Sequence, residues 1–483
     1  MLGFLKPVLY VVGLFLTGLG AMMLIPGLVD VAKGDPDAEV FFVSAAITIF
    51  LGSMFAITNR GDASRIEPRQ AFVLTTTAWV VTPLFGALPF AFSSLEMSFA
   101  DSYFEAMSGL TTTGATVIVG LDNAPDGIIV WRALLHGIGG LGIVVMGVLI
   151  LPFLKVGGAQ LFRAESSDKS ERPFPRFTQV VAAISVVYLA LLLICAAALW
   201  LAGMSPFDAL LHSLATISTG GFSTRDASVG FYQSYWIHWI IVVFMALGGM
   251  PLTWHVRVLR EGRRALFADN QVWVFLTIVG GASLLTALWL WATSPTPAFQ
   301  ALTLATFNVM SITTTTGFVT ADYATWGTFP IVMFFLLGFV GGCSGSTSGS
   351  IKVFRWELFF GGLRRLAIQN IQPNRVLPLY YNARRVAPDT IFSVFSFILL
   401  FLVTFGAVTL AGAALGLDFV TAASGAIATM GNVGPGLGEI IGPAGNYKPL
   451  SDEVKWLFSL AMMLGRLELL TVLVLLFPDF WRT

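Results

Sequence analysis

The chain has 483 residues, of which 56% are hydrophobic and only 11% are charged, and its 27 basic residues balance its 27 acidic ones. This composition, with its strongly positive mean hydropathy, excludes a soluble globular domain. The zero net charge gives no reason to expect a nucleic-acid partner. Apolar runs of about 20 residues, enough to cross a bilayer, recur roughly ten times. We therefore predict an all-α polytopic membrane protein, and no structural disulfide between Cys195 and Cys343.

Residues 1–67 contain two apolar segments, near residues 7–29 and 39–58, and no pore-loop motif. They predict an N-terminal pair of transmembrane helices. Only one basic residue, Lys6, precedes the first segment, and no small-residue cleavage site follows it at a suitable place. We therefore expect this first helix to be retained rather than removed as a signal peptide.

From residue 68 onward, one unit occurs four times: a membrane helix, a short half-helix, a glycine-containing loop and a second membrane helix. The units are predicted at residues 68–173, 174–268, 269–384 and 385–483. Their loops read TTTGAT at 111–116, STGGFS at 218–223, TTTTGF at 313–318 and GNVGPG at 431–436. With Gly114, Gly221, Gly317 and Gly434 taken as equivalent, the loops are 107, 96 and 117 residues apart. Such divergent repeats predict a pseudo-fourfold pore.

The sequence contains a helix start signal for each half-helix. Asp101, Asp208 and Asp418 stand in N-cap-like positions, and Thr296 followed by Pro297 opens the third half-helix. Each half-helix would aim its carboxyl end at the middle of the membrane, where about half a negative charge favours a cation. Ordinary capped loops would explain one such segment, but they do not explain four in register.

The loop chemistry suits a dehydrated monovalent cation, because backbone carbonyls can replace hydration water and glycine permits the required conformations. The loops contain no ring of carboxylates, which argues against a divalent-cation filter. The alternative is that the glycines only form turns. Matching Phe222 to Phe318 selects Gly221 over Gly220, although the register stays open by one residue. The candidate filter residues are Thr112, Thr113, Gly114, Gly220, Gly221, Thr315, Thr316, Gly317, Asn432, Val433 and Gly434.

Basic residues concentrate in every second connection, which predicts that these connections and both termini are cytoplasmic. The clusters are Lys6, residues 60–69, 155–176, 257–264 and 352–385, and Arg482. The intervening connections carry acidic residues, so the four loops should open outward through an acidic mouth. Residues 364–385 fit this positive-inside pattern and also fit a docking surface, and both interpretations can hold together.

The stretch GGCSGSTSGS at residues 341–350 interrupts the second membrane helix of the third unit. Non-helical backbone at that depth is tolerated where it is buried in protein or lines a water-filled cavity. We therefore expect a cavity-lining loop; a small-residue face for helix packing is the alternative. Nucleotide binding is not expected, because the preceding soluble strand and the GK[ST] ending are missing. The candidate gating residues here are Gly341, Gly342, Gly345, Gly349 and Lys352.

Arg466 lies near the middle of the last apolar segment, residues 454–477. A charge at that depth costs at least about 2.5 kcal/mol, so it normally faces a cavity or a partner. Glu468 is two residues away and should point to a different helix face. We expect Arg466 to project into the ion path and bond carbonyls of the 341–350 loop. The alternative is a buried arginine that pairs with Glu468 of another protomer or with a helix end.

No catalytic constellation indicates an enzyme, and the four histidines, His136, His212, His238 and His255, lack metal-ligand spacing. A membrane enzyme would need clustered catalytic groups, and an organic-solute carrier would need a site between two repeat halves. A symporter driven by sodium or protons is the remaining rival. The membrane-proximal acids Glu105, Glu439 and Glu468 form no evident proton relay.

The chain resembles the bacterial potassium-uptake subunits of the Trk/Ktr/HKT superfamily along nearly its whole length. The resemblance is carried by SGLTTTGAT at 108–116, HGIGGLGIVVMGVLILP at 136–152, ISTGGFS at 217–223, SITTTTGF at 311–318 and GNVGPGLG at 431–438. The N-terminal helix pair is similar to the TrkH and TrkG branch. Glycine in all four loops matches potassium-selective members, whereas members with serine in the first loop tend to admit sodium.

This resemblance implies potassium, or rubidium in its place, as the permeant ion, with no cofactor in the chain. It also implies a homodimer embedded in lipid in the bacterial inner membrane. A cytosolic nucleotide-binding ring of the TrkA type would regulate the pore, and the 341–350 loop would occlude it beneath the filter.

Overall fold

The computed structural model describes residues 2–60, 67–150, 174–382 and 384–482. Most of the basic cluster predicted at 155–176 lies outside these residues. Within them, seven helices are long and apolar enough to cross a membrane, and two sharply bent helix pairs would add two more spans. The chain is therefore a multi-pass, almost entirely helical membrane protein, as predicted.

The N-terminal pair consists of α1 (Leu2–Lys33) and α2 (Ala38–Thr58). The two helices touch closely, since a Cβ on Gly52 would lie 2.6 Å from the backbone nitrogen of Thr17. Small residues at such crossings let membrane helices approach each other. At the end of α1, the Asp30 carboxylate accepts a 2.6 Å hydrogen bond from the Gly127 N–H, which ties the pair to the first predicted unit.

The remaining elements follow the predicted order of membrane helix, half-helix, loop and second helix. Unit 1 contains α3 (Pro68–Gly86), α4 (Leu88–Phe92), α5 (Phe99–Leu110), η1 (Leu121–Asn123) and α6 (Asp126–Ile150). Unit 2 contains α8 (Phe174–Leu201), α9 (Pro206–Ile217), η2 (Ser228–Phe231), α10 (Tyr235–Gly249), α11 (Leu252–Glu261) and η3 (Gly262–Phe267).

Unit 3 contains α12 (Asn270–Thr293), α13 (Ala298–Thr313), η4 (Tyr323–Thr325), α14 (Thr328–Leu337) and α15 (Val353–Ile371), followed by a two-stranded antiparallel hairpin. Its strands, β1 (Tyr380–Tyr381) and β2 (Arg384–Arg385), place Tyr380 opposite Arg385. Unit 4 contains α16 (Pro388–Ala414), α17 (Phe419–Met430), α18 (Gly438–Ile441), α19 (Asp452–Arg466), α20 (Leu470–Leu473), η5 (Val474–Leu476) and α21 (Pro478–Trp481).

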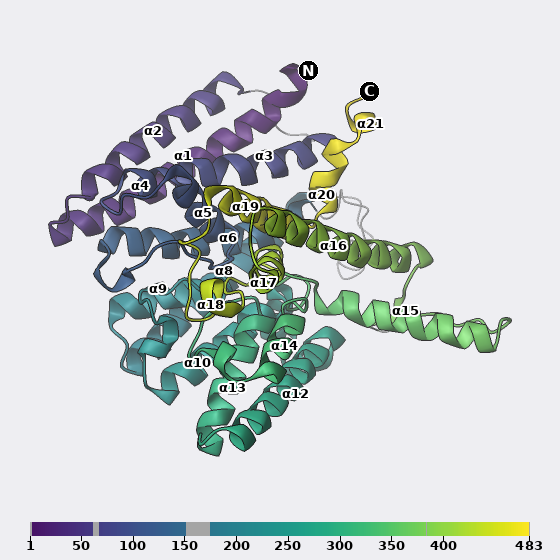
Figure 1. The fold of residues 1–483 in the computed structure, drawn as a ribbon. Helices are drawn as coiled ribbons and strands as arrows, with labels where there is room; N and C mark the ends of the chain where they lie inside the picture. The colour runs from purple at the N-terminus through teal and green to yellow at the C-terminus, as the bar shows by residue number, and fades with distance from the viewer. Residues whose placement is uncertain (1, 61–66, 151–173, 383, 483) are drawn as a thin grey trace.

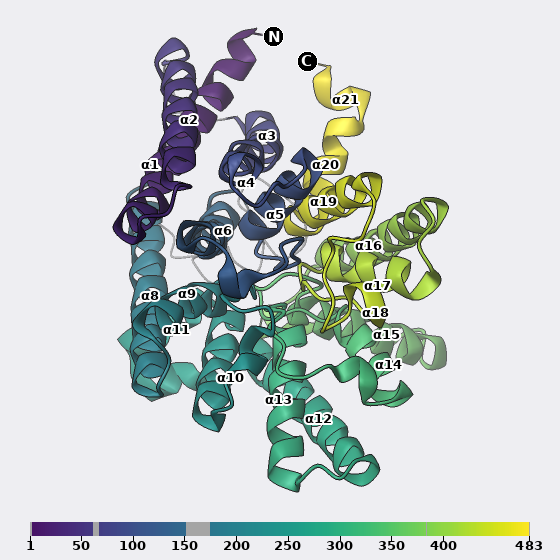
Figure 2. The same ribbon diagram turned by 60° about the vertical axis from the view of Figure 1, so that its left-hand side comes forward.

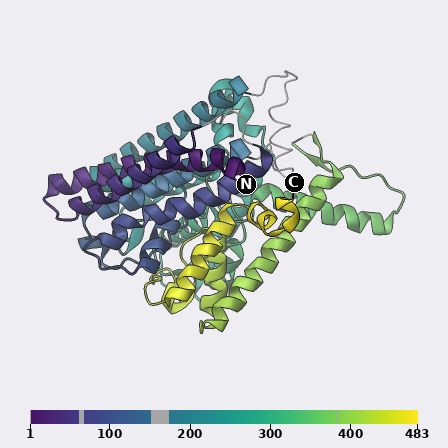
Figure 3. The ribbon, with the colours of Figure 1, turned by 90° about the horizontal axis from the view of Figure 1, so that it is seen from above.

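The units follow one another around a centre, from blue through teal and green to yellow, while α1 and α2 stand at the outside (Figure 2). Helix α15 packs against α16, with the Phe359 and Phe395 rings in contact, and its carboxyl end projects from the other helices (Figures 1 and 3). The two termini lie near each other. Two large hydrophobic clusters form the core, one mainly from the first and fourth units and the other mainly from the second and third. The core therefore surrounds the place where the four loops meet.

The half-helices are α5, α9, α13 and α17, and two of their predicted caps were wrong. Ser98 and Ser205 are the N-caps of α5 and α9, and their hydroxyls accept from the N–H of Asp101 and Asp208. The aspartates stand three residues later, because a serine hydroxyl fits the orphan N–H groups of the first turn. Asp101 instead bonds the ammonium groups of Lys448 and Lys455, each at 2.7 Å.

The other two half-helix starts agree with the sequence more closely. Pro297 is the N-cap of α13, so the helix opens directly after the predicted Thr296–Pro297 pair. Asp418 is the N-cap of α17, and its carboxylate accepts from the Thr421 N–H at 3.0 Å.

Replacing Asp418 with alanine is expected to lower the free energy of unfolding by about 1 kcal/mol, because the first turn of α17 loses its cap. Hydrogen bonds from Thr421, first from its hydroxyl and then from its N–H, lower the pKa of Asp418. The stabilisation is therefore complete above the unfolded-state pKa and disappears as the pH falls through the lower folded-state pKa. Unfolding of the detergent-solubilised protein between about pH 3 and pH 7 measures this. Asp418→Asn, which keeps an acceptor, should remain close to wild type at neutral pH.

The second membrane helices bend more often than the sequence predicted. The expected break in unit 3 is present, since residues 338–352 separate α14 from α15. Helices α10 and α11 also meet at 94°, next to Pro251, which has no N–H to continue a helix. The segment 454–477, predicted as one helix, bends by 102° after Arg466. There Glu468 and Leu469 have φ angles of 56° and 42°. Arg466 is thus at the end of a helix, not in the middle of one.

Candidate ion pathway

All four half-helices end with the same backbone geometry. One residue after the C-cap adopts a left-handed conformation, with φ of 52° to 58° at Thr112, Thr219, Thr315 and Asn432. The next amide then bonds the carbonyl five residues earlier, as in Thr113 N–H to Ser108 O at 2.9 Å. A β-branched residue at positive φ is strained, and strain of this kind concentrates at functional sites. Thr219, which was absent from the predicted filter residues, belongs to this set.

The loop glycines come two residues after the strained position. Gly114, Gly221, Gly317 and Gly434 have φ values of 83°, 79°, 82° and 103°. Gly220 is not among the glycines with positive φ. The structure therefore makes Gly221, not Gly220, the counterpart of the other three glycines.

The four loops form a closed ring in which each glycine faces the carbonyl of the next loop. A Cβ on Gly114 would collide with Gly220 O, one on Gly221 with Thr316 O, and one on Gly317 with Val433 O. A Cβ on Gly434 would lie 2.6 Å from Thr113 O, so the fourth loop contacts the first and the ring is closed. Segments more than 300 residues apart in the sequence thus meet at backbone contact. The predicted filter residues of all four units come together in this ring.

One side of the ring opens into a hollow. All four loop glycines line it, together with Arg132, Arg225 and Tyr447 from the surrounding segments. Arg225 is paired with Asp122 at 3.3 Å and with Asp208 at 3.5 Å. The Tyr447 hydroxyl donates to Gly434 O at 2.8 Å, so the fourth loop is held from the wall of the hollow.

The 341–350 loop lies against the ring on the side of the strained residues. Thr315 Oγ1 accepts from the Gly349 N–H at 2.7 Å and lies 3.2 Å from Ser348 Oγ. The Thr219 hydroxyl donates to Thr347 Oγ1 at 3.1 Å. A Cβ on Gly349 would collide with Gly431 O, so the loop also touches the fourth unit. The loop therefore contacts the ends of three of the four half-helices.

The candidate gating glycines hold this loop in a compact form. Gly341, Gly342 and Gly349 are buried and Gly345 is half-buried. The Gly342 N–H donates to Ser348 Oγ at 2.8 Å, which closes the loop on itself. Its outer side is held by helix ends, because Leu252 N–H donates to Gly345 O at 3.0 Å. The Lys352 ammonium donates to Ser348 O, at the loop's exit.

Arg466 is 5% exposed, and its Nε and Nη2 atoms have no hydrogen-bond partner among the residues that the structure describes. The predicted bonds from Arg466 to carbonyls of the 341–350 loop are therefore absent for these two nitrogens. Glu468, the acid considered as its alternative partner, pairs with Arg355 at 2.8 Å in the same chain. Electrostatic interactions link Arg466 to Lys352, Tyr188 and His136. Its buried charge thus acts on these three side chains.

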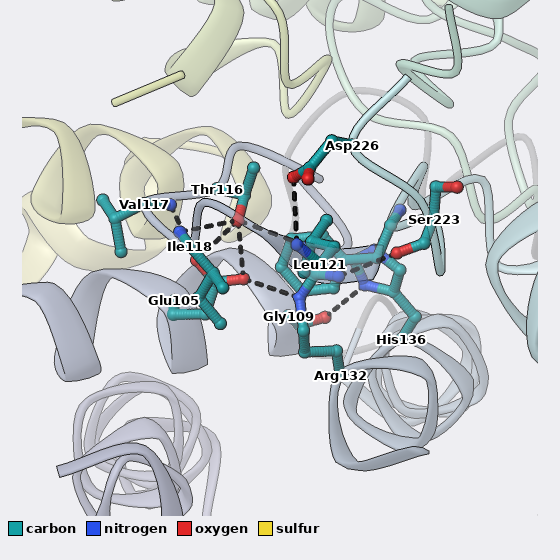
Figure 4. A network of polar contacts seen from close by, with 11 residues as sticks. Glu105, Gly109, Thr116, Val117, Ile118, Leu121, Arg132, His136, Ser223 and Asp226 are labelled. Atoms are coloured by element: carbon teal, nitrogen blue, oxygen red, sulfur yellow. Dashed lines mark hydrogen bonds and ion pairs between the residues drawn. The ribbon is translucent and has the colours of Figure 1, made fainter. Parts of the chain in front are cut away.

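A buried ion pair behind the ring was missed from the sequence (Figure 4). Glu105 in α5 and Arg132 in α6 lie 2.8 Å apart, and their side chains are at most 2% exposed. The Glu105 carboxylate accepts from Thr116 Oγ1 at 3.0 Å and from Val117 N–H at 2.9 Å. Glu105 was noted as an acid near an apolar segment, but its partner is 27 residues away on another helix. Nothing in local spacing signals such a pair.

Arg132 and His136 connect the first unit to the second (Figure 4). Arg132 Nη1 donates to Ser223 O at 2.8 Å, and its guanidinium lies 4.0 Å from the centre of the Phe222 ring. His136 Nδ1 lies 2.8 Å from Gly109 O, and its Nε2 accepts from the Phe222 N–H at 3.0 Å. Since Nε2 accepts, Nδ1 carries the proton. His136 is therefore a bridge between the first half-helix and the second loop.

Comparison with known proteins gives one consistent family. The family described as "TrkH: Cation transport protein" matches residues 37–482. The chain is 43% identical to the Trk system potassium uptake protein TrkI of Halomonas elongata, over 99% of this chain and 97% of that protein. It is 37% identical to the Trk system potassium uptake protein TrkH of Escherichia coli K12, over 98% of both. The crystal structure of the potassium transporter TrkH from Vibrio parahaemolyticus matches with a TM-score of 0.92 and 35% identity, over 99% of both chains.

Proposed function

Because this chain belongs to the TrkH family of cation transport proteins, we propose that it carries potassium into the cell across the bacterial inner membrane, through the ring formed by its four loops. The observation that carries the proposal is the closure of that ring, in which every loop glycine faces the carbonyl of the next loop. The names of the relatives, which are potassium uptake proteins, support potassium as the ion.

The ring's chemistry suits potassium because its ligands would be backbone carbonyls and hydroxyls rather than carboxylates. Each loop follows the carboxyl end of a half-helix, where the helix dipole adds about half a negative charge. Carbonyls held in this way can replace the hydration shell of a monovalent cation. Glycine leaves space for the neighbouring carbonyl, so Gly114, Gly221, Gly317 and Gly434 determine how closely the loops approach.

Beneath the ring, the 341–350 loop and Arg466 would form the gate. The loop bonds Thr219 and Thr315 directly under the filter, so an ion leaving the ring inward would meet it first. The charge of Arg466 would raise the electrostatic barrier in the same space. A cytosolic nucleotide-binding partner would control this gate, and two copies of the chain would form a homodimer. The exposed, basic β1–β2 hairpin and α15 are the elements that such a partner would reach.

Ion flux into proteoliposomes containing the purified chain tests the proposal. Potassium, rubidium and sodium are compared under an imposed voltage without a proton gradient. We expect potassium and rubidium to enter and sodium to be disfavoured. If flux appears only with a proton or sodium gradient, the chain is a coupled symporter, the main rival. If it appears only after a cytosolic partner is added, the pore alone is closed.

A further inference from the structure

The half-helices carry a second set of equivalent positions, behind the ring. Nine residues before each loop glycine, the first three units have a polar side chain: Glu105, His212 and Asn308. All three side chains are fully buried. Burial of a polar group costs free energy unless it finds a partner. In each case one partner is the segment that follows the loop glycine, and Glu105 also pairs with Arg132.

In units 1 and 2 this contact is made by a carboxylate and by an imidazole. Glu105 accepts from the Thr116 hydroxyl and the Val117 N–H, as described above. His212 Nε2 lies 3.1 Å from Ser223 Oγ, while its Nδ1 lies 2.8 Å from Asp208 O. Thr116 and Ser223 both come two residues after their loop glycine. The two side chains therefore hold the same point of their respective loops.

In unit 3 a carboxamide takes this position. Asn308 Nδ2 donates to Thr320 Oγ1 at 2.9 Å, and its Oδ1 accepts from the Thr320 N–H at 3.4 Å. A second bond, from Nδ2 to Leu304 O at 2.8 Å, fixes the amide on its own helix. Thr320 comes three residues after Gly317, so the hydrogen-bonded residue lies one position farther from the loop glycine than in the first two units.

In unit 4 a neighbouring residue makes the hydrogen bond, because the equivalent position is a glycine. Gly425 stands at the equivalent position, and a Cβ there would lie 2.6 Å from the Phe458 ring, which fills the space. The neighbouring Ser424 supplies the contact, since its hydroxyl accepts from the Leu437 N–H at 2.9 Å. The segment that follows each loop glycine is thus hydrogen-bonded to its half-helix, by a different side chain in each of the four units.

We propose that Glu105, His212 and Asn308 are positioning residues that fix the spacing of the ring carbonyls and thereby set the preference for potassium over sodium. The inference rests on the proposed function, in which these carbonyls coordinate the ion. A carbonyl ring favours the larger ion only when it resists collapse onto the smaller one, or when it keeps the number and field strength of its ligands. Hydrogen bonds from a half-helix to the segment just after the loop glycine resist this collapse, and they do so from outside the ion path.

Asn308→Leu is the sharpest test, because it removes the contact with a side chain of the same branched skeleton and leaves the net charge unchanged. Thr320→Val removes the acceptor of the hydrogen bond from Asn308 Nδ2. Because Thr320 is only half-buried, this second variant should fold even if Asn308→Leu does not. The reversal potential in proteoliposomes gives the potassium-to-sodium permeability ratio. We expect each variant to lower it by about three- to tenfold, the size associated with one neutral hydrogen bond. The double variant should show little loss beyond that of Asn308→Leu, since the hydrogen bond that Thr320→Val removes is one that Asn308→Leu already removes.

Thr303→Val is the matched control, because the Thr303 hydroxyl is buried in the same half-helix and, among the described residues, bonds only the Phe299 carbonyl of that helix. It should leave the permeability ratio unchanged. The inference is overturned if Asn308→Leu and Thr320→Val both fold and both keep the wild-type ratio while Gly317→Ser, which alters the ring itself, lowers it. If Gly317→Ser also leaves the ratio unchanged, the filter assignment fails and the inference fails with it.

Discussion

A Gly317→Ser variant is expected to lower the potassium-to-sodium permeability ratio by about 10- to 100-fold, through both lower potassium flux and higher sodium flux. The added Cβ would collide with the Val433 carbonyl, which belongs to the next loop in the ring. Overpacking of this kind costs about 1–3 kcal/mol, and each 1.4 kcal/mol corresponds to about a tenfold change. The collision displaces a carbonyl that would coordinate the ion, so the cost acts directly on selectivity. Reversal potentials and rubidium uptake in proteoliposomes measure it.

Gly120→Ser is the matched control for this prediction. Gly120 also has a positive φ, 81°, but nothing lies within 4 Å of a Cβ built there. The variant therefore carries a similar backbone strain without a collision in the ring, and its permeability ratio should match wild type. A Gly317→Ser protein that folds, transports potassium and still rejects sodium would contradict the assignment of the ring as the filter.

Replacing Arg466 with alanine is expected to raise potassium flux by about 10- to 30-fold. At an effective dielectric constant of about 20, a unit charge acts on a cation about 8 Å away with about 2 kcal/mol, which corresponds to roughly 30-fold in rate. Within the described part of the chain, two of its guanidinium nitrogens lack a hydrogen-bond partner, so less structure depends on this side chain than on Arg355, which bonds Glu468. Single-channel current, or rubidium uptake at fixed voltage, is the measurement.

Arg466→Lys separates charge from shape in this experiment. It keeps the positive charge, so flux should remain near the wild-type level if the barrier is electrostatic. Equal gains in the lysine and alanine variants would indicate a steric role instead. Unchanged or reduced flux in a folded Arg466→Ala protein would count against Arg466 as a barrier.

Several features were wrong or missed from the sequence because they depend on distant parts of the chain. The apolar pattern of residues 454–477 favours one helix, but the structure bends it after Arg466, where Glu468 leaves the helix and pairs with Arg355. Asp101 was read as a cap, yet it binds two lysines more than 300 residues away, and Ser98 is the cap. In each case, the side chain binds a residue that is distant in the sequence, and local spacing gives no sign of that partner.

The sequence by itself determined the membrane-spanning, all-helical class, the order of helices and loops, and the loop glycines of the first, third and fourth units. These features are local, because hydrophobic run length and short motifs depend on neighbouring residues. Only the tertiary structure decided that Gly221 rather than Gly220 matches the other glycines, which carbonyl each glycine faces, and that Glu105 pairs with Arg132. These are contacts between segments up to several hundred residues apart. Packing of whole helices brings them together, and no periodicity within one segment encodes that packing.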